Sequence, residues 1–158
     1  MGWSVHYVVI VPGAVLPEDS LLIHEHLRTW NSELHEGSES MSLVEVPFEQ
    51  RRAEPLTGQM FREIEIMLGT YTYGPSGPAF EAPPVYASNT YLWGFTKVQY
   101  SRKPTEDFCT VLRALRDLAQ LRRAWTIYAS DDYDTVPRLT HVASLPDPKD
   151  LLARARAT

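Results

Sequence analysis

The chain has 158 residues, of which 44% are hydrophobic and 22% charged, and its formal net charge is -5. This length suits one domain whose core needs no metal or disulfide, and the composition is wrong for a disordered chain. An acidic balance argues against a nonspecific nucleic-acid binder, because neutralising phosphates requires clustered lysine and arginine. No apolar run approaches the about 18 residues that cross a bilayer, and no signal-peptide pattern opens the chain. We therefore expect a single domain over residues 1–158, located in the cytoplasm and bound to neither membrane nor nucleic acid.

The N-terminal segment predicts a buried strand followed by a helix. Val5 to Val11 is short, rich in β-branched residues and ended by Pro12 and Gly13, which is typical of a buried strand. Pro17 suits a first helical turn, and the acidic residues after it lie where the helix dipole favours anions. The apolar residues that follow recur at helical spacing: Ile23, Leu27, Trp30 and Leu34.

The next segment is expected to contain a second strand, a short helix and an unusual loop. Met41 to Phe48 alternates as an edge strand does, and Thr57 to Leu68 has an N-cap residue and an apolar face ended by Gly69. Residues 69–84 hold too many prolines and glycines for a regular element, so we expect a loop laid against the domain. Its aromatic side chains suit the core, an interaction surface or a pocket wall: Tyr71, Tyr73 and Phe80.

The second half of the chain predicts several strands and the most regular helix. Tyr91 to Tyr100 alternates in the manner of a strand, and Pro104 opens an amphipathic helix. The apolar stripe of that helix consists of Phe108, Val111, Leu112, Leu115, Leu118 and Ala119. Shorter strands are expected at Val85 to Ala87, Trp125 to Ala129 and Leu139 to Ala143, and a terminal helix at Asp150 to Ala157.

Taken in order, these elements form two strand–helix–strand units separated by an insertion. Such units favour an α+β fold in which a mainly antiparallel sheet carries two or three helices on one face. The sequence therefore predicts a ferredoxin-like α/β sandwich with an insertion rich in proline, glycine and aromatic residues.

The residues that most often carry catalysis or bind metals do not form a recognisable motif. His24 and His26 point about 200° apart on a helix, so we expect a polar helix flank there. Cys109 is the only cysteine, and near a helix N-terminus such a residue is usually a small hydrophobe at the core edge. The sequence also lacks a nucleophile elbow and a phosphate-binding loop. We therefore expect no catalytic residue, no metal site and no cofactor.

One group of carboxylates directly follows a predicted strand. Asp131, Asp132 and Asp134 surround Tyr133 after the strand that ends at Ala129. Aspartate favours turns, so the group is typical of a solvated turn. It also suits a recognition patch, and carboxylates at a strand end are able to bind a hard cation. The sequence leaves these three interpretations open.

In size, acidity and expected fold, the chain resembles the cytoplasmic immunity proteins of bacterial polymorphic toxin systems. An acidic and aromatic segment adds to this resemblance: Tyr128, Asp131, Asp132, Tyr133 and Asp134. The resemblance implies an inhibitor that tightly occludes a cognate toxin or another basic protein, such as a basic nuclease. We assign partner binding to the aromatic loop and the acidic segment, that is, to Tyr71, Tyr73, Phe80, Asp131, Asp132, Tyr133 and Asp134.

Two other functions stay open beside the inhibitor. A small enzyme or ligand-binding domain would use a pocket against the sheet, with His6, His141 and Tyr91 among its polar groups. An assembly protein would instead pair the exposed edges of its sheet. We rank the inhibitor first because the sequence holds an acidic and aromatic segment and no catalytic motif.

Overall fold

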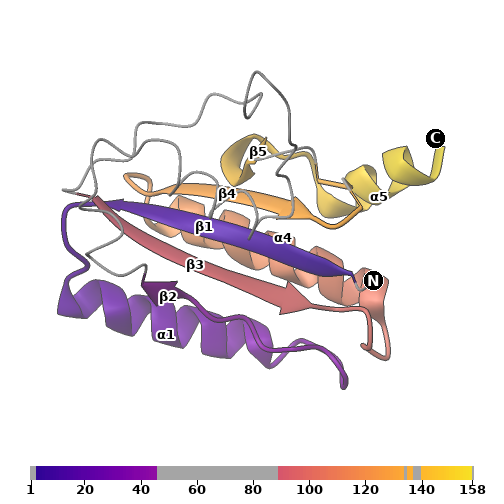
Figure 1. Ribbon diagram of the computed structural model, residues 1–158, viewed down its shortest axis with the longest axis horizontal. Coiled ribbons are helices and arrows are strands. Elements are labelled where there is room, and N and C mark those ends of the chain that lie inside the picture. Colours follow the sequence, from indigo (N-terminus) through magenta and orange to yellow (C-terminus); the bar gives the residue numbers. More distant parts are fainter. Residues whose placement is uncertain (1–2, 46–88, 134, 137–139, 158) are drawn as a thin grey trace, which may run out of the picture.

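The computed structural model describes residues 3–45, 89–133, 135–136 and 140–157 (Figure 1). Its strands are β1 (Ser4–Pro12), β2 (Val44–Glu45), β3 (Asn89–Lys97), β4 (Thr126–Asp131) and β5 (Thr140–His141). Its helices are α1 (Pro17–Asn31), α4 (Pro104–Leu121), the 3-10 helix η1 (Val142–Ser144) and α5 (Pro148–Ala157). The helix predicted at Thr57 to Leu68, the loop predicted at 69–84 and the strand predicted at Val85 to Ala87 lie outside the described residues.

The predicted elements that fall within the described ranges are confirmed, with shifted ends. β4 ends at Asp131 instead of Ala129, and the strand predicted at Leu139 to Ala143 is divided between β5 and η1. Up to residue 45, the strand predicted from Met41 is reduced to the two residues of β2. The α+β class is therefore confirmed.

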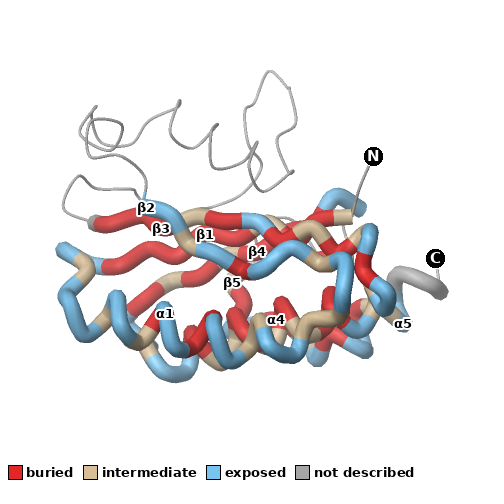
Figure 2. The backbone as a smooth tube through the Cα atoms, turned by 90° about the horizontal axis from the view of Figure 1, so that it is seen from below, coloured by how far each residue is buried: buried red, intermediate tan, exposed pale blue. Residues whose placement is uncertain are grey.

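The strands form one antiparallel sheet in the order β2-β3-β1-β4-β5. β1 is the central strand. It pairs with β3 from the Ser4–Lys97 pair onward, and with β4 from the Val5–Asp131 pair onward. Helices α1 and α4 cover one face of this sheet (Figure 2).

Both faces of β1 are buried, which explains its unbroken apolar sequence. The residues that join the main core are Val5, Tyr7, Val9 and Val11. Val8 and Ile10 alternate with them, point to the opposite face and are buried as well. A slip of one residue would turn the half-buried His6 into the main core and remove the Tyr7 hydroxyl from Thr96, so these two residues fix the register of the central strand.

Helix α4 supplies the other half of the main core. Pro104 occupies its first turn, as predicted, because a proline there gives up an N–H that would have no partner within the helix. Its predicted apolar stripe is buried throughout: Phe108, Val111, Leu112, Leu115, Leu118 and Ala119. α4 also contacts α1, η1 and α5, so the helical layer is arranged around it.

The expected polar flank at His24 and His26 is wrong for His26. Its side chain is buried, and its Nε2 donates a hydrogen bond to the carbonyl oxygen of Ala114 over 2.8 Å. Its Nδ1 lies 3.7 Å from a carboxylate oxygen of Asp117. The physical reason is the packing of α1 against α4, which turns this ring inward, whereas His24 remains exposed.

Gly94 in β3 allows the backbone of Ser42, just before β2, to lie against the backbone of β3. A Cβ atom at this position would overlap the carbonyl oxygen of Ser42 and the ring of Tyr7. The Tyr7 hydroxyl accepts a hydrogen bond from the Ser42 N–H over 3.2 Å and lies 3.0 Å from the Thr96 hydroxyl. Only glycine fits between these groups, so the residue fixes how the edge of the sheet is built.

Gly94→Ala is expected to lower the free energy of unfolding by about 1–3 kcal/mol, because backbone atoms must move to admit the methyl group. Chemical denaturation followed by circular dichroism measures this change. Gln120→Ala on the exposed side of α4 is the control, and it should stay within about 0.5 kcal/mol of the unsubstituted protein. An unchanged denaturation midpoint for Gly94→Ala would contradict the close approach of the two segments.

Candidate functional site

The group of carboxylates noted in the sequence is divided at the end of β4. Asp131 is the last residue of β4, and its side chain is fully buried. Its Oδ2 accepts a hydrogen bond from Trp3 Nε1 over 3.0 Å, and its Oδ1 accepts one from the Val136 N–H over 2.9 Å. The solvated turn is therefore wrong for Asp131, which is not part of an exposed surface. The reason is that β4 continues two residues beyond Ala129, so Asp131 points to the same inner face.

Asp131 ties the start of β1 to the chain that follows β4. Burial raises the pKa of its carboxyl above the ordinary value of 3.8, although hydrogen bonds from Val136, Trp3 and Thr135 act in the opposite direction. The group is thus a structural support beneath the surface rather than a contact for a partner.

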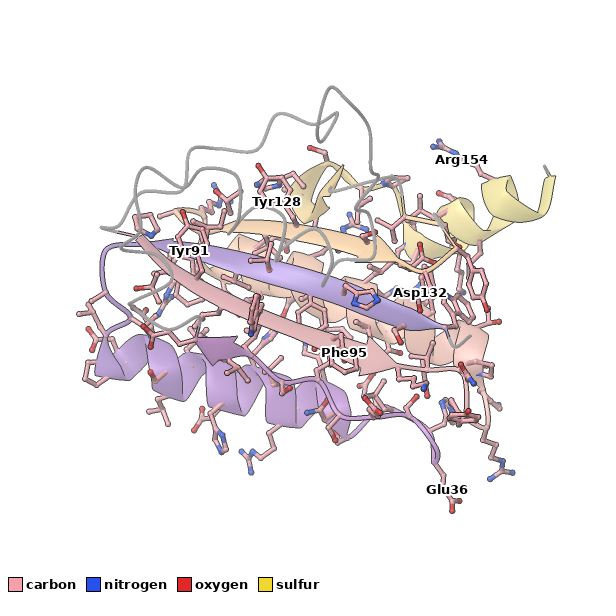
Figure 3. The ribbon with its side chains drawn as sticks, viewed as in Figure 1. Glu36, Tyr91, Phe95, Tyr128, Asp132 and Arg154 are labelled. Carbon is pink, nitrogen blue, oxygen red and sulfur yellow. The ribbon has the colours of Figure 1, made fainter. Side chains whose placement is uncertain are left out.

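Asp132, the next residue, is held at the surface by two groups of β1. One carboxylate oxygen lies 2.7 Å from His6 Nε2, and the other accepts a hydrogen bond from the Ser4 N–H over 2.8 Å. The His6 ring stacks on Phe95 with a centroid separation of 5.9 Å, because the β1–β3 register places these residues opposite each other. Figure 3 shows Phe95 and Asp132 at the same end of the sheet.

Tyr133 continues this surface around the end of the sheet. It packs edge-on against Trp3 with a centroid separation of 6.4 Å, and Trp3 stacks on Phe108 of α4 at 4.8 Å. The exposed tyrosine therefore rests on an aromatic stack that reaches into the core. We call His6, Phe95, Asp132 and Tyr133 the strand-end patch.

The other residues predicted for partner binding lie outside the described part of the chain: Tyr71, Tyr73, Phe80 and Asp134. Phe95 was not predicted to belong to the site. The alternation of Tyr91 to Tyr100 indicates which residues of β3 share a face, but only the register with β1 brings Phe95 to His6. His6 and His141, named for a pocket, lie on strands separated by β4 and therefore do not meet.

A second polar cluster is centred on Asp107. Like the position of Phe95, it was not predicted from the sequence. Asp107 lies in α4 and is fully buried. Its carboxylate accepts hydrogen bonds from the His35 N–H over 3.1 Å, from the Ser38 hydroxyl over 2.6 Å and from the Ser101 hydroxyl. Burial alone would raise its pKa, but the hydrogen bonds from Ser101, Ser38 and His35 outweigh burial and lower it below 3.8. Asp107 is therefore ionised at neutral pH.

The Asp107 carboxylate also orients the ring of His35. The ring Nδ1 lies 2.7 Å from a carboxylate oxygen, and an ionised carboxylate only accepts hydrogen bonds. This contact therefore places a proton on Nδ1 of the ring. Nε2 lies 3.5 Å from a carboxylate oxygen of Glu106 and belongs to the wall of a cavity.

A groove of about 660 Å³ lies between α1 and residues 41–45. Its apolar lining includes Ile23, Leu27, Met41 and Leu92. Polar side chains also line it, among them His24, Arg28 and Glu45. This groove is the feature that best suits a pocket near the sheet.

No family model matches the chain, and neither a curated protein nor a solved structure matches it. Among the residues that the structure describes, no three His, Cys, Asp or Glu side chains are grouped as a metal ion requires. None of the helices in the described ranges is long and apolar enough to span a membrane. Function is therefore inferred from geometry alone.

The two buried carboxylates should affect acid stability in opposite directions. Because the pKa of Asp107 is lowered on folding, its stabilisation is present above about pH 4 and is lost as the pH falls through its folded pKa. Because the pKa of Asp131 is raised, the folded state gains from protonation just above pH 4. Asp107→Asn should cost about 1–3 kcal/mol at pH 7 and flatten the acid-induced loss of stability, whereas Asp131→Asn should steepen it.

Urea denaturation of both variants between about pH 3 and pH 7 measures these slopes. The two variants serve as controls for each other, since each replaces one buried carboxylate by an amide. Slopes that change in the same direction would contradict the assigned environments.

Proposed function

We propose that the protein is a protein-binding inhibitor, as immunity proteins are, and that a basic partner docks on the strand-end patch. One observation carries the proposal. Phe95 and Tyr133 are 48% and 57% exposed, and the carboxylate of Asp132, the residue before Tyr133, is fixed by hydrogen bonds to Ser4 and to His6, on which Phe95 stacks. Large aromatic side chains beside a fixed polar group are typical of the residues that dominate binding energy in interfaces.

The rigidity of the patch supports this role. Phe95 stands on β3 and stacks on His6, while Tyr133 rests on Trp3. A partner therefore meets side chains whose positions are set before binding, and little conformational entropy is lost when the complex forms. A preorganised surface of this kind favours tight binding, as occlusion of a toxin demands.

The charge of the chain supports a basic partner. The formal net charge of -5 attracts a positively charged protein over several ångströms, and Asp132 offers a carboxylate at the point of contact. Charges of this kind act mainly on the rate of association and on the choice of partner. A cytoplasmic toxin with a basic surface, such as a nuclease, fits both properties.

We also propose that the frame of the patch is a ferredoxin-like sandwich. The element orders β1-α1-β2 and β3-α4-β4 support this topology, as does the strand order β2-β3-β1-β4. In such a frame β1 and β3 are neighbours although they belong to different units. This adjacency is what brings His6 to Phe95.

The alternative is a small enzyme or ligand-binding domain. The groove between α1 and residues 41–45 favours it, because an apolar floor with a few polar side chains is typical of small-molecule sites. The inhibitor ranks higher because the aromatic residues of the strand-end patch are exposed on a surface rather than gathered in a cavity.

Phe95→Ala should weaken partner binding by about 2 kcal/mol, or about 30-fold, mainly through faster dissociation, because it removes an aromatic anchor. Asp132→Lys should instead slow association and reduce its dependence on salt. The tagged protein captures its partner from the native host, and mass spectrometry identifies that partner. Surface plasmon resonance at low and high salt then gives both rate constants for each variant.

Two matched controls lie away from the patch. Leu121→Ala truncates a side chain that is 49% exposed at the end of α4, and Glu25→Lys reverses an exposed charge on α1. Both should bind as the unsubstituted protein does. Equal affinity and equal salt dependence for the patch variants and the unsubstituted protein would overturn the proposal.

A further inference from the structure

A cavity of about 510 Å³ lies between α4, α5 and the chain after α1. Figure 1 shows α5 at the end of the molecule where β1 begins. One side of α4 forms a wall, with Glu106, Cys109 and Arg113 at positions that face the same way. The other charged or titratable side chains of the lining are Lys149 of α5, His35 and Glu33. The cavity is separate from the strand-end patch.

The charges in this cavity are separated into two ends. Glu106 and Arg113 are seven residues apart on α4, which places their Cα atoms about 10 Å apart along the helix axis. His35 belongs to the acidic end, because its Nε2 lies 3.5 Å from a carboxylate oxygen of Glu106. Lys149 lies at the other end, where Arg113 is 3.6 Å from a carboxylate oxygen of Asp147, just before α5. Because the side chains of that pair are 38% and 49% exposed, the pair is weak and leaves Arg113 available to a ligand.

The acidic end is built to accept hydrogen bonds from a cation. The Glu106 carboxylate, an acceptor, lies at this end, with His35 Nε2 3.5 Å from one of its oxygens. Lys103 lies 3.7 Å from the other oxygen of Glu106, but both side chains of that pair are more than half exposed. An exposed pair of this kind is weak, so it leaves Glu106 available to a ligand.

We propose that this cavity binds a small dipolar ligand of the amino-acid class, with its ammonium group at Glu106 and its carboxylate at Arg113 and Lys149. The ammonium donates to the Glu106 carboxylate, while the basic side chains donate to the ligand carboxylate. The distance between the two ends selects a ligand whose charges are separated by several bonds. A ligand with only one charge leaves one end of the cavity unpaired.

The probe is ε-aminocaproate, whose ammonium and carboxylate are joined by five methylene groups. Titration of the full chain, followed by two-dimensional NMR of the backbone amides, should give saturable shifts around residues 105–113 and 149–153. Caproate and hexylamine carry one charge each, and glycine carries both charges too close together. All three should bind at least about tenfold more weakly, since each loses a charge-assisted contact.

Substitutions then test the two ends separately. Glu106→Gln and Lys149→Met should each weaken binding of ε-aminocaproate about tenfold. Both residues are exposed, so the folded state should persist, and thermal unfolding checks this. Glu25→Gln and Lys97→Met remove the same charges elsewhere on the molecule and should leave the affinity unchanged.

Three outcomes would overturn the proposal. The first is the absence of saturable shifts with ε-aminocaproate. The second is equal binding of the singly charged probes, and the third is an unchanged affinity in both cavity variants. Because partner binding is measured at a different surface, failure here leaves the strand-end patch untouched, and failure there leaves this cavity untouched.

Discussion

The structure depends on the pairing of β1 between β3 and β4. This strand is buried on both faces, and its register is fixed because a slip would carry His6 into the core and separate the Tyr7 hydroxyl from Thr96 and Ser42. The same register places His6 opposite Phe95 and brings the start of the strand to Asp132. A displacement by one residue would bury the wrong side chains and separate His6 from Phe95. The strand-end patch is therefore a consequence of how the central strand is packed.

Two buried carboxylates secure the ends of the elements around this sheet. Asp131 joins Trp3 and Val136, which are far from each other in the sequence, and Asp107 joins the chain after α1 to the start of α4. Their environments differ in one respect. Asp107 accepts hydrogen bonds from hydroxyl groups and an imidazole and stays ionised, whereas burial dominates at Asp131. Both carboxylates stabilise the fold, and each lies close to a surface feature. Asp131 lies beneath the strand-end patch, and Asp107 lies beside the cavity.

The helices and strands in the described ranges follow from local patterns in the sequence, because periodicity and proline positions act over short distances. The buried stripe of α4 is the clearest case. The site is harder to predict, since its contacts join distant segments. Asp131 and Asp132 are neighbours in the sequence, yet one is buried and the other is held at the surface, because the end of β4 lies between them. Phe95 gains its position only through strand register. The Asp107 carboxylate accepts hydrogen bonds from His35, Ser38 and Ser101. These contacts depend on tertiary packing, and no local sequence motif predicts them.

The central claim is that a basic partner covers the strand-end patch, and site-specific photo-crosslinking in the native host tests it most directly. A photoreactive phenylalanine analogue replaces Phe95 in one variant and Leu21, which is 59% exposed on α1, in another. We expect a crosslink from position 95 to one basic protein, and none to that protein from position 21. Crosslinking of the same protein from position 21 alone, or no crosslink from position 95, would contradict it.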